Sequence, residues 1–167
     1  VYNAPWYSKA PKIRKVESAG TIVLNANSVG LFAYCRNLTD LTGLAGWNVS
    51  NVRNMDYMFS GCSITDLAPI ASWNVSNVTS MSCMFSSCSS LTDLTGLAAW
   101  NVSKVTNMLQ MFYGCYNLTD LTGLVSWNVS KVTSMSSMFS GCSKLTDLIP
   151  LANWNVSNVM TMDYMFS

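Results

Sequence analysis

Apolar residues recur at close to every third position along most of the chain. One representative stretch has them at Val75, Val78, Met81, Met84, Cys88, Leu91, Leu94, Leu97 and Trp100. This spacing matches neither the 3.6-residue period of an amphipathic helix nor the two-residue period of a strand. It suits a coil that winds around a narrow axis and points every third side chain inward, so the pattern predicts a solenoid.

The same unit is repeated along the chain with a period of 26 or 27 residues. Written from its tryptophan, it reads W-N-V-S-[NK]-V-x-x-M-x-x-M-F-x-x-C-x-x-L-T-D-L-x-[GP]-L. Its tryptophan column is Trp47, Trp73, Trp100, Trp127 and Trp154, and its cysteine column is Cys35, Cys62, Cys88, Cys115 and Cys142. Self-similarity at this period is the signature of a repeat architecture.

Two segments of the unit predict local structure. The i, i+3, i+4 spacing of M-x-x-M-F predicts a short helical or 3-10 turn. L-T-D-L predicts a short strand that pairs in parallel with its counterpart in the next coil. The Gly or Pro that follows should end the strand, because Pro has no N–H to donate. The expected fold class is therefore an α/β repeat solenoid with short parallel strands and short helical or 3-10 turns.

The repeat also sets the expected domain organisation. Residues 1–20 form a non-repeat N-terminal segment, and residues 21–167 form the solenoid. Residues 21–46 are expected to be a degenerate capping coil, with Ile22 in the first Val column and with Leu31 and Phe32 in the M-F columns. Later coils start at the five column tryptophans, and the last coil is incomplete.

Composition narrows the function classes. Only 10% of residues are charged, against roughly 25% in a typical protein, and the net charge is +1 with no histidine. The absence of histidine removes the commonest general base and zinc ligand, and no basic stripe marks a nucleic-acid surface. No apolar run is long enough to span a membrane. We expect no enzyme activity, no cofactor, no metal and no nucleic-acid partner.

The cysteine and tryptophan columns each have two interpretations. The cysteines are expected to form a buried structural column, since five in a row cannot all pair and a zinc site needs convergent ligands. Cys83 takes the place of Tyr57, Gln110 and Ser137 in other coils, so we expect it at the surface. The tryptophans are expected in the core, and the alternative is an aromatic platform for sugar rings.

Two polar columns are also ambiguous. Each carboxylate of Asp40, Asp66, Asp93, Asp120 and Asp147 is expected to cap backbone amides in an Asx turn, and the alternative is a row of calcium sites. The Asn48 column is expected to satisfy backbone groups at a turn. In a eukaryotic secretory pathway, N-x-[ST] would instead make glycosylation acceptors of Asn37, Asn48, Asn74, Asn77, Asn101, Asn117, Asn128 and Asn155.

The W-N-V-S-N-V-T-x-M-x-x-M-F-x-x-C-x-x-L-T-D-L pattern resembles the 26-residue repeat of the BspA-like leucine-rich repeat group of surface proteins, over residues 21–167. The resemblance implies a leucine-rich-repeat-like solenoid, an extracellular or cell-surface location and a role in adhesion or binding. It supplies no catalytic residues. We expect the solenoid to be right-handed.

The sequence therefore predicts a non-enzymatic extracellular or cell-surface repeat protein that binds a protein or carbohydrate ligand. The alternatives are a subunit of a head-to-tail surface filament, or a fragment of a longer repeat array. A filament would use both ends of the solenoid, because an uncapped coil invites pairing with another chain. The candidate residues for this self-assembly are Trp6, Tyr7, Ile13, Met162, Met165 and Phe166.

Overall fold

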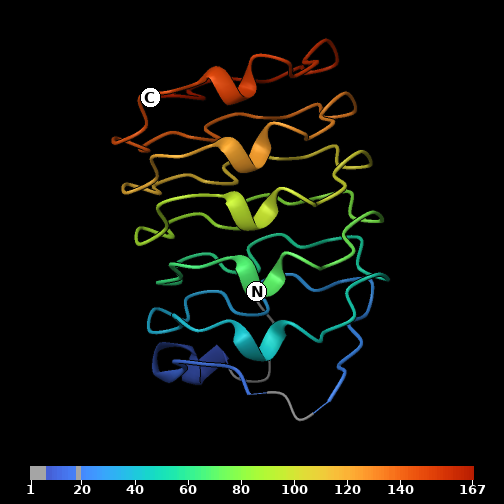
Figure 1. Cartoon of the computed structure of the whole chain (residues 1–167), viewed down its shortest axis with the longest axis vertical. Coiled ribbons are helices and arrows are strands. Elements are labelled where there is room, and N and C mark those ends of the chain that lie inside the picture. The colour runs from blue at the N-terminus through green and yellow to red at the C-terminus, as the bar shows by residue number, and fades with distance from the viewer. Residues whose placement is uncertain (1–6, 18–19) are drawn as a thin grey trace.

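The computed structural model describes residues 7–17 and 20–167, and these form a stack of similar coils (Figure 1). Five of the 3-10 helices begin 26 or 27 residues apart and lie one above another along the stack (Figure 1). The helices are η1 (Tyr7–Lys12), η2 (Thr42–Leu44), η3 (Ala68–Ile70), η4 (Thr95–Leu97), η5 (Thr122–Leu124) and η6 (Ile149–Leu151). The periodicity and the continuous core confirm the repeat solenoid.

The parallel strands predicted from L-T-D-L do not form. Within residues 7–17 and 20–167 there are only isolated parallel bridges, such as Asp93 with Asp120. The chain turns too soon for a strand, because Oδ1 of Asp93 accepts the backbone N–H of Thr95 at 3.1 Å. That turn leads directly into η4, so the Gly or Pro column lies inside a 3-10 helix and does not end a strand.

The helical turn predicted at M-x-x-M-F is a series of tight turns with no 3-10 helix. Two positions four residues apart in most coils have positive φ, as at Tyr57 (58°) and Gly61 (72°). Each stands third in its turn, where a type II geometry requires positive φ. Alternate N–H groups then point along the stack, so that Tyr57 donates to the carbonyl of Ser82 at 2.9 Å. These ladders replace the expected sheet.

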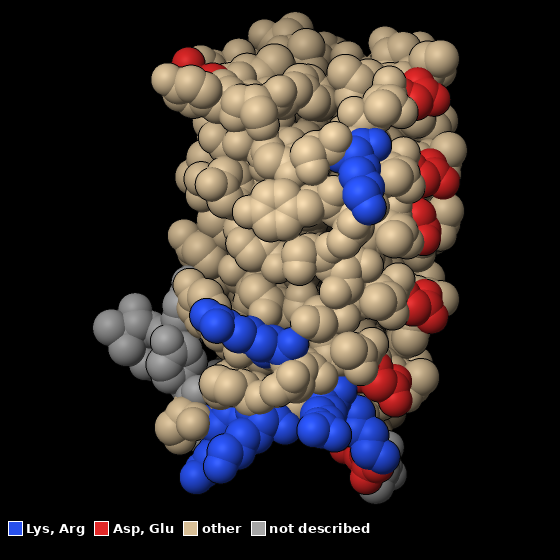
Figure 2. Space-filling view, turned by 90° about the vertical axis from the view of Figure 1, so that its left-hand side faces the viewer, with Lys and Arg blue, Asp and Glu red and all other residues tan. Residues whose placement is uncertain are grey.

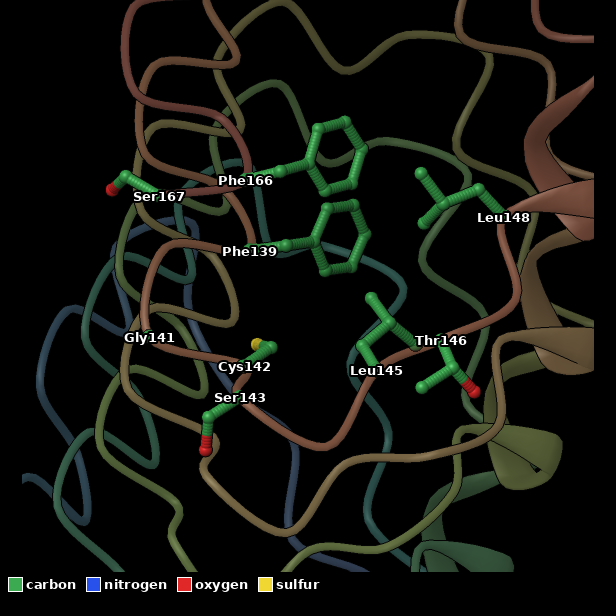
Figure 3. A pocket seen from close by; sticks show the side chains of 9 residues that line it. All are labelled: Phe139, Gly141, Cys142, Ser143, Leu145, Thr146, Leu148, Phe166 and Ser167. Carbon is green, nitrogen blue, oxygen red and sulfur yellow. The ribbon is translucent and has the colours of Figure 1, made fainter.

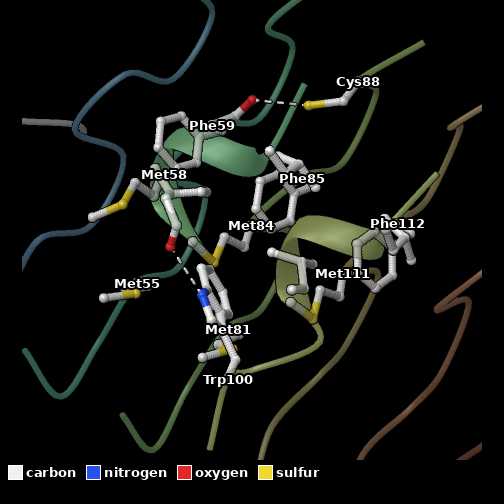
Figure 4. Close-up of a cluster of buried hydrophobic side chains, with 14 of the residues drawn as sticks. Met55, Met58, Phe59, Met81, Met84, Phe85, Cys88, Trp100, Met111 and Phe112 are labelled. Carbon is white, nitrogen blue, oxygen red and sulfur yellow. Dashed lines mark hydrogen bonds between the residues drawn. The ribbon is translucent and has the colours of Figure 1, made fainter. Parts of the chain in front are cut away.

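Stacked aromatic rings run through the core. The rings of Phe32, Phe59, Phe85, Phe112, Phe139 and Phe166 follow one another with centroids 5.6 to 5.8 Å apart. Figure 4 shows part of this ladder with the methionines packed around it. Met81, Met84 and Phe85 are fully buried. Every coil thus adds one layer of the same side chains to a continuous apolar interior.

The N-terminal segment covers the first coil. Residues 13–17 lie beside residues 38–41, with a parallel bridge between Lys15 and Asp40. Ile13 and Val16 pack against the core, and Ala10 in η1 is buried. I-R-K-V therefore occupies the place of L-T-D-L one coil earlier.

The register expected for the first coil is partly wrong. Phe32 joins the ring ladder as predicted, and Leu31 packs against the core. Ile22, however, is 42% exposed, while Leu24 packs against the core. The bridges of Val23 with Asn48 and of Asn27 with Asn54 explain the shift, because this arc is two residues shorter than in the next coil.

Candidate functional site

The cysteine column is buried and reduced. Each thiol from Cys62 onward donates to the carbonyl of a phenylalanine in the preceding coil, as from Cys88 Sγ to Phe59 O at 3.2 Å (Figure 4). Burial raises the pKa of Cys35 and Cys142 to about 11, and it raises the pKa of Cys88 and Cys115 well above the ordinary thiol value. These thiols are poor nucleophiles at neutral pH.

Cys83 is buried at 3% exposure, so the predicted surface position is wrong. Its backbone has a φ of 55°, and its thiol donates to Gln110 Oε1 of the next coil at 3.5 Å. In the preceding coil, a hydrogen bond with Cys83 raises the pKa of Tyr57. Neighbouring coils thus cover a position that a single repeat would leave open.

The tryptophan column lies in the core, as expected. Trp73, Trp100 and Trp127 are at most 4% exposed, so their faces are closed to sugar rings. The Trp100 indole N–H donates to Ile70 O at 3.1 Å, the last carbonyl of η3 in the preceding coil. Trp73, Trp127 and Trp154 make the equivalent bond. Trp47 has no acceptor for its N–H within the described part of the chain.

The Asx turns predicted for the aspartate column are confirmed. Oδ1 of each aspartate accepts the N–H two residues on, at 2.7 to 3.1 Å, from Thr42, Ala68, Thr95, Thr122 and Ile149. The bonds from Thr42, followed by the charge of Lys15, lower the pKa of Asp40. Residues 7–17 and 20–167 contain no group of three or more Cys, Asp or Glu arranged to hold a metal ion.

The asparagine sequons fall into two structural groups. Asn48, Asn74, Asn101, Asn128 and Asn155 are exposed, and their Oδ1 atoms accept turn N–H groups, which confirms their expected structural role. Asn37, Asn77 and Asn117 instead donate Nδ2 to carbonyls of the preceding coil, at Pro11, Ser50 and Ser89. A glycan on this second group would replace one hydrogen of an amide nitrogen that bonds to the preceding coil. Use of the sequons stays a prediction.

The residues predicted for self-assembly lie in different environments. Trp6 falls outside the described residues, Tyr7 starts η1, Ile13 is half-buried and Met165 is buried. Met162 and Phe166 are 40% and 49% exposed on the last coil. Figure 3 shows a pocket of about 350 Å³ there, in which Phe139 and Phe166 face Leu145 and Leu148.

The corner of the solenoid above the cysteine column is hollowed in its first part, and we call this whole surface the cysteine-corner furrow. It is formed by the residues on either side of the column cysteines: Tyr34, Arg36, Gly61, Ser63, Ser87, Ser89, Gly114, Tyr116, Gly141 and Ser143. Its first part encloses about 320 Å³ between Tyr34, Arg36 and the serines, with Cys62 among the lining residues. The furrow was not predicted from the sequence.

Charge is unevenly distributed around this corner. Figure 2 shows basic side chains on this face, while acidic side chains form a line along its edge. Arg36 lines the furrow and Lys144 lies exposed beside Ser143. The aspartate column belongs to the neighbouring segment of each coil, where it caps the 3-10 helices. The furrow itself contains no carboxylate among its described lining residues.

Together the fold and its outer columns define a repeat solenoid whose thiols and carboxylates serve the backbone. A family model described as "Mycoplasma protein of unknown function, DUF285" matches residues 25–119 and again residues 92–167. The chain belongs to this family, with two overlapping matches that reflect its internal repeat. A search of curated proteins gave no match. None of the helices in the described residues has the length and hydropathy to cross a bilayer.

Proposed function

We propose that this protein is a non-enzymatic repeat protein of the cell surface or extracellular space that binds a protein or carbohydrate ligand. We also propose that its family is part of the BspA-like leucine-rich repeat group and that its coil is right-handed. The W-N-V-S-N-V and L-T-D-L segments carry the resemblance.

One observation carries the proposed function: the reactive groups are committed to structure while the neutral polar ones face outward. The column carboxylates cap turns and the buried thiols donate to carbonyls. The outer columns present exposed amides and hydroxyls such as Asn101, Asn128 and Thr119. A rigid polar surface of this kind suits recognition better than catalysis, because catalysis needs groups with differently tuned pKa values.

Surface labelling tests the location. Lys104, Lys131 and Lys144 are exposed, so a membrane-impermeant amine reagent should modify them on intact producing cells. A cytosolic protein of the same cells serves as the control and should be labelled only after lysis. If the three lysines also react only after lysis, the proposed location is wrong. Beads coated with the chain should then be tested for retention of extracellular matrix proteins and of glycans.

A second candidate is a head-to-tail filament, favoured by the apolar surface of the last coil. Met160 in this coil and Ile149 in η6 just before it are 80% and 79% exposed. The N–H groups of Met162, Tyr164 and Phe166 donate to no acceptor within the described residues. Further repeats of the same chain would cover this surface equally well. Sedimentation of the purified chain tests the filament: large assemblies that dissolve on deletion of residues 1–20 would support it, and a stable monomer would exclude it.

A further inference from the structure

Three hydroxyls of the cysteine-corner furrow make no bond within the described part of the fold, whereas the hydroxyl of Ser63 donates to Arg36 O at 2.6 Å. Elsewhere hydroxyls join neighbouring coils, as when Thr119 donates to Thr92 O and Ser126 donates to Ala98 O. Within the described residues, the hydroxyls of Ser87, Ser89 and Ser143 make no hydrogen bond. The furrow therefore presents a row of hydroxyls with both donor and acceptor capacity to a ligand.

The ring of Tyr116 packs close to Gly114 and Gly141 of the furrow. A Cβ built on Gly141 would lie 3.4 Å from its Cε1, and one built on Gly114 would lie 3.7 Å from its Oη. The tyrosine nevertheless remains 54% exposed, so its outward face is open. A large ring with few rotatable bonds, fixed against backbone, binds a ligand at a small cost in conformational entropy.

The furrow offers no free main-chain edge. Gly61 N donates to Ser86 O, Ser87 N to Tyr113 O and Gly114 N to Ser140 O, whereas the N–H groups of Ser63, Ser89 and Tyr116 donate to no acceptor within the described residues. A peptide strand added by backbone hydrogen bonds needs unpaired N–H and C=O groups along an edge. The three free N–H groups belong to separate coils and do not line the edge of one strand. A ligand of this furrow is therefore held by these isolated donors, by side-chain hydroxyls and by the face of a ring, which is the chemistry that recognises sugars.

Charge and spacing restrict the ligand further. Arg36 makes no ion pair within the described residues and lines the furrow, where a planar guanidinium favours a carboxylate. Lys144 adds a second positive charge near the opposite end. Equivalent phenylalanine rings of successive coils have centroids 5.6 to 5.8 Å apart, and this spacing is of the order of one sugar unit in an extended chain.

We propose that the cysteine-corner furrow binds an extended acidic oligosaccharide along the solenoid axis. A sugar ring stacks on Tyr116, the hydroxyls of Ser87, Ser89 and Ser143 bind sugar hydroxyls, and Arg36 binds a carboxylate. This inference rests on the proposed binding function and assigns that function a site and a class of ligand.

The test begins with an array that carries neutral glycans and glycans containing uronic or sialic acids. We expect the purified chain to bind acidic glycans. For the tightest of these, titration calorimetry is then run with the glycan and with its carboxyl methyl ester, which keeps every sugar and removes the charge. Tyr116→Ala and Arg36→Gln should each weaken binding of the acid by about tenfold or more. Arg36→Gln should leave binding of the ester unchanged.

Tyr164→Ala is the matched control, because Tyr164 is 76% exposed and lies outside the furrow. It should bind the glycan like the parent chain, and equal melting temperatures would show that all three variants fold. If both Tyr116→Ala and Arg36→Gln still bind acidic glycans, the furrow is not the binding site, although the proposed binding function is unaffected. Binding of matrix proteins without any glycan overturns only this inference, and binding of neither overturns both.

Discussion

At the scale of single residues, the indole N–H groups link each coil to the one before it. Trp100→Phe removes the bond to Ile70 O, which still accepts the backbone N–H of Trp73 at 3.1 Å, so we expect the lost bond to cost about 0.5–1.5 kcal/mol. Trp47→Phe is the control, because the Trp47 N–H has no acceptor within the described residues and its loss should cost less. Urea unfolding of both variants measures the difference, and equal losses would contradict the role of the bond.

The buried thiols make stability depend on pH in the alkaline range. Burial raises the pKa of Cys115 in the folded state well above its ordinary value of 9.0. The unfolded chain therefore loses this proton first, and the contribution of the thiol is complete below pH 9 and declines above it. We expect the parent chain to lose roughly 1.4 kcal/mol per pH unit for each such thiol.

Cys115→Ala provides the comparison for this pH dependence. It should lower stability at pH 7, because a buried side chain is truncated. Between pH 9 and pH 10.5 its stability should fall less steeply than that of the parent chain. Urea titrations at several pH values give both slopes, and parallel slopes would show that the thiol is not protected from ionisation.

Sequence alone predicted which columns face inward, because a period of three places Trp100 and Cys88 on the same side as Leu94. It did not predict the burial of Cys83, since that depends on Gln110 and Tyr57 in the adjacent coils. The position of the exposed Tyr116 ring was not predicted either, because it also depends on residues of the adjacent coil. The pair Gly114 and Gly141 was the available signal, because two glycines one repeat apart leave room for a ring.

At the scale of elements, close contact between successive 3-10 helices limits what the glycine column accepts. A Cβ on Gly123 would lie 1.8 Å from Leu94 O, so Gly123→Ala must push two coils apart. We expect a loss of about 1–3 kcal/mol. Gly46→Ala is the matched control, with nothing within 4 Å of its Cβ, and it should be neutral or slightly stabilising. Thermal melting compares the two, and similar behaviour would refute the close packing.

The turns of M-x-x-M-F hold non-glycine residues in a left-handed conformation. Gln110 has a φ of 54°, which costs an L-residue roughly 1–2 kcal/mol. We expect Gln110→Gly to stabilise the chain by up to about 1 kcal/mol, while Leu109→Gly at the preceding position destabilises it. Chemical unfolding of the two variants decides the matter. A loss of stability in Gln110→Gly would mean that its contact with Cys83 outweighs the backbone strain.

The sequence patterns placed these elements at the right positions in the chain. The conformation of each element, however, differs from the predicted one. The spacing of Met81, Met84 and Phe85 is that of a helix, yet the positive φ at Cys83 between them prevents one. L-T-D-L has strand-like residues, yet the Asp93 side chain turns the backbone into η4. In both cases one residue decides the conformation, through a left-handed backbone or a side-chain bond that periodicity does not report.

At the scale of the whole molecule, each coil contacts only its neighbours, so stability should vary along the stack. Coil 127–153 lies between two coils, whereas residues 154–167 contact one, and Trp154 is correspondingly less buried than Trp127. We expect amides of residues 154–167 to exchange hydrogen through local opening, well below the free energy that protects coil 73–99. Mass spectrometry of hydrogen exchange at increasing urea resolves the two. If both segments exchange with the same free energy, the molecule unfolds as one cooperative unit and the nearest-neighbour description fails.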